Sequence, residues 1–156
     1  MDILTLRGQE TVRQENLAIK IWEKNVPDFK YVHTPKDRPC TVDAFLVKNN
    51  IIQAVVETKC RDMYLGKLKT KYSWRWLVTF EKIVMAQNIA RQLHVPLVGF
   101  LYCIPDKTLL VHTIWNPKTG YCDFEVMKTK TQATVNGGDA TRDNAYINVK
   151  EAKVYE

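Results

Sequence analysis

The sequence lacks the features of a membrane or secreted protein. No stretch of about 18 consecutive apolar residues occurs, which is the length that a membrane-spanning helix needs. The N-terminus has no basic start followed by an apolar run, the mark of a signal peptide. There is also no internal repeat or low-complexity tract in the 156 residues. We therefore expect a single domain over residues 1–156 with no membrane span and no signal peptide.

Several common catalytic and metal-binding patterns are missing as well. The four cysteines are widely spaced, with no C-x-x-C and no histidine at zinc-finger spacing, so we expect reduced thiols in a cytoplasmic protein, with a disulfide or zinc site as the alternative. No Ser/His/Asp or Cys/His arrangement is visible, and His112 in its apolar run is typical of a core residue. The Gly137-Gly138 pair lacks the pattern of a phosphate-binding loop and indicates a turn.

The charge is unbalanced towards basic residues. The net charge is +6 and the isoelectric point is near 9.1. Apolar residues make up 46% and charged residues 26%, which is ordinary for a globular protein. An excess of positive charge favours a polyanionic partner, although many basic proteins bind no nucleic acid.

The most informative stretch is residues 41–59. Two apolar, β-branched runs are joined by Asn49-Asn50, which predicts a β-hairpin. Asp43, Glu57 and Lys59 are ionisable residues in this apolar background. Burying such groups costs several kcal/mol unless they pair or bind a metal. Their presence therefore requires an explanation, either mutual ion pairing or a bound metal.

The register of this hairpin decides whether the three charged residues meet. Glu57 and Lys59 share one face of the second strand, because side chains alternate. A two-residue turn alone would pair Asp43 with Val56 and point the aspartate to the opposite face. We predict the other register, with an odd-length loop or a bulge, because it brings two carboxylates and an ammonium group together.

These groups suit the chemistry of phosphodiester hydrolysis. Two carboxylates and a strand carbonyl, here that of Thr58, make a hard oxygen site for Mg²⁺ or Mn²⁺. The Lys59 ammonium group would then orient the attacking water or stabilise charge on a phosphate.

Asp43, thirteen spacer residues and Glu57-Thr58-Lys59 resemble the D-(x)n-(D/E)-x-K signature of the PD-(D/E)xK nuclease superfamily. This superfamily includes restriction endonucleases, archaeal Holliday junction resolvases and many phage nucleases. Val42 replaces the usual proline before the aspartate. The resemblance implies an α/β fold, namely a restriction-endonuclease-like mixed β-sheet flanked by helices. It also implies a DNA substrate, and by analogy a homodimer and a phage origin, which would place the protein in the host cytoplasm.

The first helix is predicted from about Thr5 to Asn25, closed by Pro27. Glu15 falls on its apolar face between Val12 and Ile19. In the resembling nucleases a glutamate of the first helix points at the metal site. The resemblance therefore implies this role for Glu15, with a partly exposed structural position as the alternative and Glu10 as the second candidate for the role.

A polar segment from Arg61 to Ser73 follows the Glu57-Thr58-Lys59 strand end, and we predict a loop there. Basic and aromatic side chains at this place can bind phosphates and stack on bases, although such a charge run is often only a solvated surface. The nucleic-acid-binding candidates are Arg61, Lys67, Lys69, Lys71, Tyr72, Trp74 and Arg75.

The apolar spacing from Trp74 to His94 predicts a second long helix, ended by Pro96. In the resembling nucleases a Lys or Gln on this helix often faces the active centre. The resemblance therefore adds Lys82 and Gln87 to the candidates, with ordinary surface positions as the alternative.

The remaining apolar runs predict strands. The longest suits a strand buried on both faces of an α/β sheet. The predicted strands cover Phe29 to Thr34, Leu97 to Ile104, Leu109 to Trp115, Phe124 to Ala133 and, as a final edge strand, Tyr146 to Val149.

The leading hypothesis is a divalent-metal-dependent endonuclease acting on DNA, with branched or junction DNA among the substrates. Asp43 and Glu57 would hold the metal with help from Glu15. The alternatives are a DNA-binding protein without catalytic activity on the same fold, or an RNA-binding or assembly factor whose acidic residues form structural ion pairs.

Overall fold

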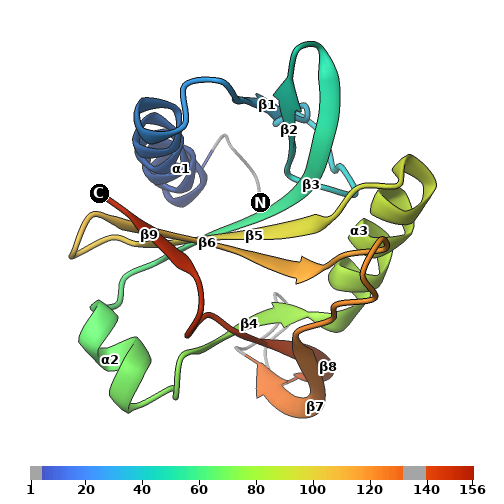
Figure 1. Ribbon diagram of the computed structural model, residues 1–156. Helices are drawn as coiled ribbons and strands as arrows, with labels where there is room; N and C mark the ends of the chain where they lie inside the picture. Colours follow the sequence, from blue (N-terminus) through green and yellow to red (C-terminus); the bar gives the residue numbers. More distant parts are fainter. Residues whose placement is uncertain (1–4, 132–139) are drawn as a thin grey trace.

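Two β-sheets organise the computed structural model, which describes residues 5–131 and 140–156. A six-stranded mixed sheet has the order β1-β2-β3-β5-β6-β9, and a three-stranded antiparallel sheet has the order β4-β8-β7. Figure 1 shows the larger sheet between α1 on one side and the smaller sheet on the other. The elements are α1 (Leu6–Asn25), β1 (Lys30–His33), β2 (Ala44–Lys48), β3 (Ile51–Arg61), α2 (Leu65–Thr70), β4 (Arg75–Thr79), α3 (Phe80–Leu93), β5 (Leu97–Cys103), β6 (Thr108–Trp115), β7 (Phe124–Thr131), β8 (Ala140–Asn148) and β9 (Lys153–Tyr155).

The first helix forms where the sequence predicts it. The Thr5 hydroxyl accepts a hydrogen bond from the Gly8 N–H at 3.0 Å, which satisfies one of the free donors at the helix start. Ala18, Ile19 and Trp22 are buried against the larger sheet. None of the helices in the described ranges is long and apolar enough to cross a membrane.

The centre of the larger sheet is β5, in which all seven residues are buried. It runs parallel to β3 and antiparallel to β6, so the predicted strand buried on both faces is confirmed. Ala54 and Val56 of β3 pack in one hydrophobic cluster with α1, and Val55 packs in a second cluster with α3. Each face of β3 is therefore covered by a different helix.

Two predictions between β3 and β5 are wrong. The predicted loop from Arg61 to Ser73 contains the short helix α2, anchored by the buried side chain of Leu68. The predicted helix from Trp74 begins only at Phe80, because the preceding residues form β4. Trp76 and Val78 are buried alternately in β4, which pairs with β8. The alternation of a strand and the spacing of a helix overlap in so short a segment.

The C-terminal part also differs from the prediction. The segment predicted as an edge strand belongs to β8, which lies between β4 and β7 in the smaller sheet. The three-residue strand β9, not predicted, pairs with β6. The predicted turn at Gly137-Gly138-Asp139 lies outside the described residues.

Candidate active site

The hairpin of β2 and β3 has the predicted register. Asn49 and Asn50 have φ angles of 52° and 60°, the left-handed conformation that a two-residue hairpin turn requires. A β-bulge next to Leu46 then shifts the pairing, so that Ala44 lies opposite Val56. The Asp43 N–H also donates to the Val56 carbonyl at 3.3 Å. The tight turn and the bulge together place Asp43 opposite Glu57.

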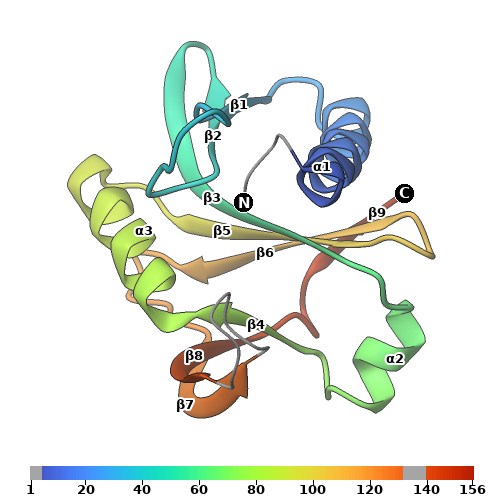
Figure 2. The ribbon, with the colours of Figure 1, turned by 180° about the vertical axis from the view of Figure 1, so that it is seen from behind.

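The side chains of Asp43, Glu57 and Lys59 lie on the face of the sheet that α3 covers. Glu57 alternates with Val56 and shares its face with Val55, which belongs to the same hydrophobic cluster as Ile83 of α3. In both ribbon views, the segment before β2 lies beside α3 (Figures 1 and 2). The site is therefore formed by the hairpin and α3.

A lysine of α3 connects the two carboxylates. The Lys82 Nζ atom lies 3.2 Å from Asp43 Oδ1 and 3.1 Å from Glu57 Oε1. Lys59 Nζ lies 3.2 Å from the same Oε1 atom. The second Asp43 oxygen accepts a hydrogen bond from the Thr58 N–H at 2.8 Å. Two acids and two lysines thus form one compact cluster.

Burial makes the two acids different. The Glu57 side chain is 0% exposed, and its Oε2 atom has no hydrogen-bond partner in the described part of the chain. Burial, and then the charge of Asp43, raise the pKa of Glu57. Burial opposes ionisation of Asp43 too, but the Lys82 charge and the Thr58 N–H outweigh it and lower the pKa of Asp43. The surroundings therefore favour the charged form of Asp43 and disfavour the charged form of Glu57.

The two carboxylates of the cluster are hard oxygen donors, the kind of ligand that a small divalent cation takes. A cation, the Lys82 ammonium group, already fits between the two carboxylates, and Glu57 Oε2 is a buried acceptor without a partner. No group of three or more His, Cys, Asp or Glu side chains among the described residues is arranged to hold a metal. Mg²⁺ commonly binds through one or two carboxylates, with water and substrate phosphate completing its shell. The two acids of this site match that arrangement.

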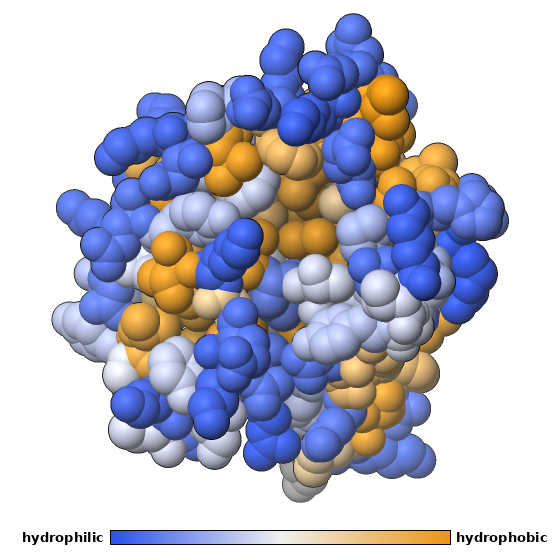
Figure 3. Space-filling view, viewed as in Figure 1, coloured by the Kyte–Doolittle hydropathy of each residue, from blue (hydrophilic) through white to orange (hydrophobic). Residues whose placement is uncertain are grey.

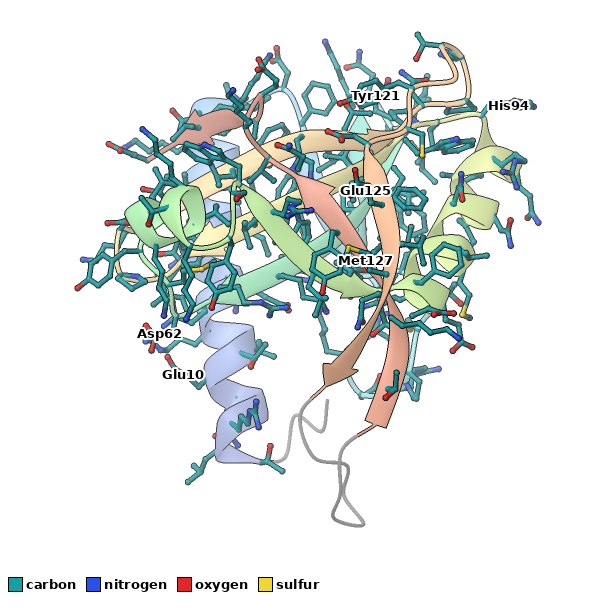
Figure 4. All side chains as sticks on the ribbon, turned by 90° about the horizontal axis from the view of Figure 1, so that it is seen from below. Glu10, Asp62, His94, Tyr121, Glu125 and Met127 are labelled. Carbon is teal, nitrogen blue, oxygen red and sulfur yellow. The ribbon has the colours of Figure 1, made fainter. Side chains whose placement is uncertain are left out.

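The structure does not bring Glu15 to the cluster. Its side chain is 12% exposed and its carboxylate pairs with Lys36 at 3.1 Å. Within the described ranges, no hydrogen bond or ion pair joins it to Asp43 or Glu57. Glu10 is exposed and binds Arg13, and Figure 4 shows it on the outer side of α1. Neither Glu10 nor Glu15 forms a hydrogen bond or ion pair with the two carboxylates in the described part of the chain.

The predicted nucleic-acid-binding residues are scattered. Lys67 and Lys69 are exposed on α2, and Lys71 and Tyr72 are exposed directly after it. Arg75 on β4 lies 3.6 Å from Glu125 of β7. We call the exposed side chains of Lys67, Lys69 and Lys71, on and directly after α2, the basic surface around α2.

Three further candidates have other surroundings. Arg61 is partly buried and donates to the carbonyls of Cys60 and Leu77 at 3.3 and 3.4 Å. Trp74 packs against the hydrophobic core. Gln87 is half-buried on α3, and no hydrogen bond to it exists in the part of the chain that the structure describes. Of the candidates on α3, only Lys82 reaches the carboxylates.

The close packing of His112 over Gly99, next to Glu57 on the same face of the sheet, was not predicted from the sequence. Glu57, Gly99 and His112 lie in one row across β3, β5 and β6. The imidazole covers Gly99 so closely that a Cβ atom there would lie 2.5 Å from His112 Cε1. Trp76 Nε1 donates to His112 Nε2 at 3.3 Å, and burial lowers the pKa of His112 to about 4. The signal available in the sequence was a glycine inside an apolar strand.

One hollow in the surface of the described residues lies away from the cluster. It has a volume of about 700 Å³ and is lined by apolar side chains of α1, the hairpin and β6, among them Trp22, Leu46 and Val111. Figure 3 shows apolar side chains in a depression on this side of the molecule. The site residues Asp43, Glu57 and Lys82 do not line it.

Comparison with known proteins identifies the fold. No protein-family model matches the chain, and no curated protein sequence matches it. Among solved structures, the chain is similar to Hjc, a Holliday junction resolvase from the archaeal hyperthermophile Archaeoglobus fulgidus. The TM-score is 0.50 at 13% sequence identity, and the match covers 89% of this chain and 93% of Hjc. The predicted restriction-endonuclease-like mixed sheet flanked by helices is confirmed.

Proposed function

We propose that this chain, which shares the fold of a Holliday junction resolvase, is a divalent-metal-dependent endonuclease that hydrolyses DNA phosphodiester bonds. The observation that supports this most strongly is the strand register, which places Asp43 opposite Glu57 in the hairpin. Lys59 Nζ lies 3.2 Å from Glu57 Oε1 beside them. Burying two acids beside each other destabilises a fold. A structural role alone therefore explains the arrangement poorly.

In the proposed reaction, Asp43 and Glu57 hold Mg²⁺ or Mn²⁺, with the Thr58 carbonyl as a further ligand. Such an ion supplies positive charge at the scissile phosphate and lowers the pKa of a bound water. Lys59 orients the attacking water and stabilises charge that develops on the phosphate oxygens. Glu15 assists only if it leaves Lys36, its present partner.

The proposed DNA contacts lie on the basic surface around α2. Lys67, Lys69 and Lys71 would contact backbone phosphates, and Tyr72 is exposed for stacking on a base. The fold shared with Hjc makes four-way branched DNA the first substrate to test. A two-fold homodimer would place two sites on two strands of such a junction.

The test is incubation of the protein with linear duplex, four-way branched and single-stranded DNA in Mg²⁺ or Mn²⁺. We expect the wild type to cut at least one of them. We expect Lys59→Ala to lose about 100-fold in rate, because one charge at the reacting phosphate is removed. Lys20→Ala, an exposed lysine of α1, is the matched control and should keep its activity. Equal cutting by wild type and Lys59→Ala would reject the proposed site.

A DNA-binding protein without catalytic activity is the second candidate. It is favoured by the position of Lys82, which already neutralises both carboxylates, so that the cluster could be stable without a metal. This candidate predicts DNA binding without cleavage in any divalent metal. It also predicts a melting temperature that does not change with Mg²⁺.

A further inference from the structure

We propose that Lys82 is a displaceable counter-ion: its ammonium group holds the cation position between Asp43 and Glu57 in the free protein, and moves to a DNA phosphate oxygen when a divalent ion binds. This inference rests on the proposed function and adds a role for a side chain of α3. It predicts that a divalent ion and the Lys82 ammonium group compete for the same place between the two acids.

The contacts of the two lysines single out Lys82. Among the residues that the structure describes, Lys59 forms an ion pair with Glu57 alone, whereas Lys82 lies within 3.2 Å of an oxygen of each acid. Lys82 Nζ fills the space between Asp43 Oδ1 and Glu57 Oε1, which is where an ion bridging the two carboxylates would lie. Lys59 pairs with Glu57 from one side and does not bridge the two acids, so it can stay beside Glu57 while that ion binds.

The charge of the cluster leads to the same conclusion. Asp43 and Glu57 carry two negative charges, and Lys59 and Lys82 carry two positive ones, so the four side chains are neutral together. A divalent ion added to this cluster leaves an excess of two positive charges in a partly buried place, where charges interact strongly. A scissile phosphate compensates this excess, and a lysine that turns towards it keeps a partner.

The position of Lys82 permits this movement. Its side chain is 31% exposed, while that of Glu57 is 0% exposed, so the ammonium group lies at the rim of the cluster. It is the third residue of α3, which begins at Phe80. Rotation of the side chain therefore carries the charge towards solvent and an approaching phosphate without movement of the sheet.

The inference is tested by titrating Mn²⁺ or Mg²⁺ into the DNA-free protein, with calorimetry and thermal unfolding as readouts. The proteins are wild type, Lys82→Met, Lys82→Arg and, as control, Lys20→Met. We expect Lys82→Met to bind metal at least about tenfold more tightly, because a competing charge is gone. Lys82→Arg keeps the charge and should bind like the wild type, as should Lys20→Met.

Cleavage gives the second measurement. Lys82→Met should cut DNA more slowly than the wild type at saturating metal, although it binds metal more tightly. If Lys82→Met unfolds because its two acids repel each other, Lys82→Gln is compared in the same titration.

Three outcomes would overturn the inference. Unchanged or weaker metal binding by Lys82→Met and Lys82→Gln, with a wild type that binds metal and cuts DNA, rejects the counter-ion role and leaves the proposed function standing. Unchanged cleavage by Lys82→Met at saturating metal rejects the transfer to phosphate. Absence of metal binding in every variant rejects both the inference and the proposed function.

Discussion

Glu57 is a carboxyl group whose fully buried place in the middle of β3 disfavours its charge. The sequence predicts this residue and its neighbours because they interrupt apolar, β-branched runs, and because strand alternation fixes their faces. Lys82 is different. Nothing around it on α3 distinguishes it from a surface lysine, so its role was predicted only from the resemblance to a nuclease family. Glu15 lies on the apolar face of α1, as the spacing predicts, and yet its carboxylate pairs with Lys36. Lys36 is a loop residue, and no local sequence pattern predicts its position.

The raised pKa of Glu57 predicts a pH dependence of stability without metal. Below the ordinary value of 4.5, Glu57 is protonated in the folded and unfolded states. As the pH rises through the higher pKa of the folded state, the buried carboxyl must ionise and stability is lost. We expect Glu57→Gln to be more stable than the wild type above about pH 4.5. The difference in the free energy of unfolding should grow with pH and reach about 0.5–2 kcal/mol at neutral pH.

The measurement is thermal unfolding in a chelator at several pH values. Glu23→Gln, an exposed position of α1, is the control and should differ from the wild type by a constant amount. A difference between Glu57→Gln and wild type that does not change with pH would contradict the prediction.

Among the elements, those with one dominant pattern were predictable and those with two were not. The helix α1, the hairpin and β5 have a single clear spacing. Residues 75–93 contain β4 and α3 with no connecting residue, since β4 ends at Thr79 and α3 begins at Phe80. The partner that makes β4 a strand is β8, which lies far along the chain and is invisible to any local window. The smaller sheet could therefore not be predicted.

The packing of His112 over β5 predicts opposite effects for two glycines. Gly99→Ala should destabilise the protein by about 1–3 kcal/mol, because a Cβ atom there would meet His112 Cε1 at 2.5 Å and Trp76 Cζ2 at 3.0 Å. Gly66→Ala lies in α2 with nothing within 4 Å and should stabilise by about 0.5–1 kcal/mol. Chemical denaturation measures both. Equal effects of the two changes would show that His112 can move aside.

For the whole molecule, the net charge of +6 predicted a polyanionic partner but not where it binds. The structure separates the buried ion cluster from the exposed lysines of α2. Substrate binding and catalysis are therefore expected to respond to different changes in the chain.

The salt dependence of DNA binding tests this separation. The slope of log affinity against log salt changes by about 0.9 for each phosphate contact. Replacing Lys67, Lys69 and Lys71 by serine should therefore reduce the magnitude of this slope by about 2 to 3. Fluorescence anisotropy at several salt concentrations measures it. Serine at Lys20, Lys24 and Lys118, which are also exposed, is the control. If the control flattens the plot equally, the DNA does not bind at α2.

The bulge next to Leu46 separates the hairpin into two parts. Between the bulge and the site, the alternation that brings Asp43 to Glu57 is fixed, while the outer part ends in the exposed Asn49-Asn50 turn. Matched insertions, one residue in each strand beyond the bulge, keep both carboxylates in place. The hairpin tip can therefore be lengthened to contact more of a bound partner without moving Asp43 or Glu57.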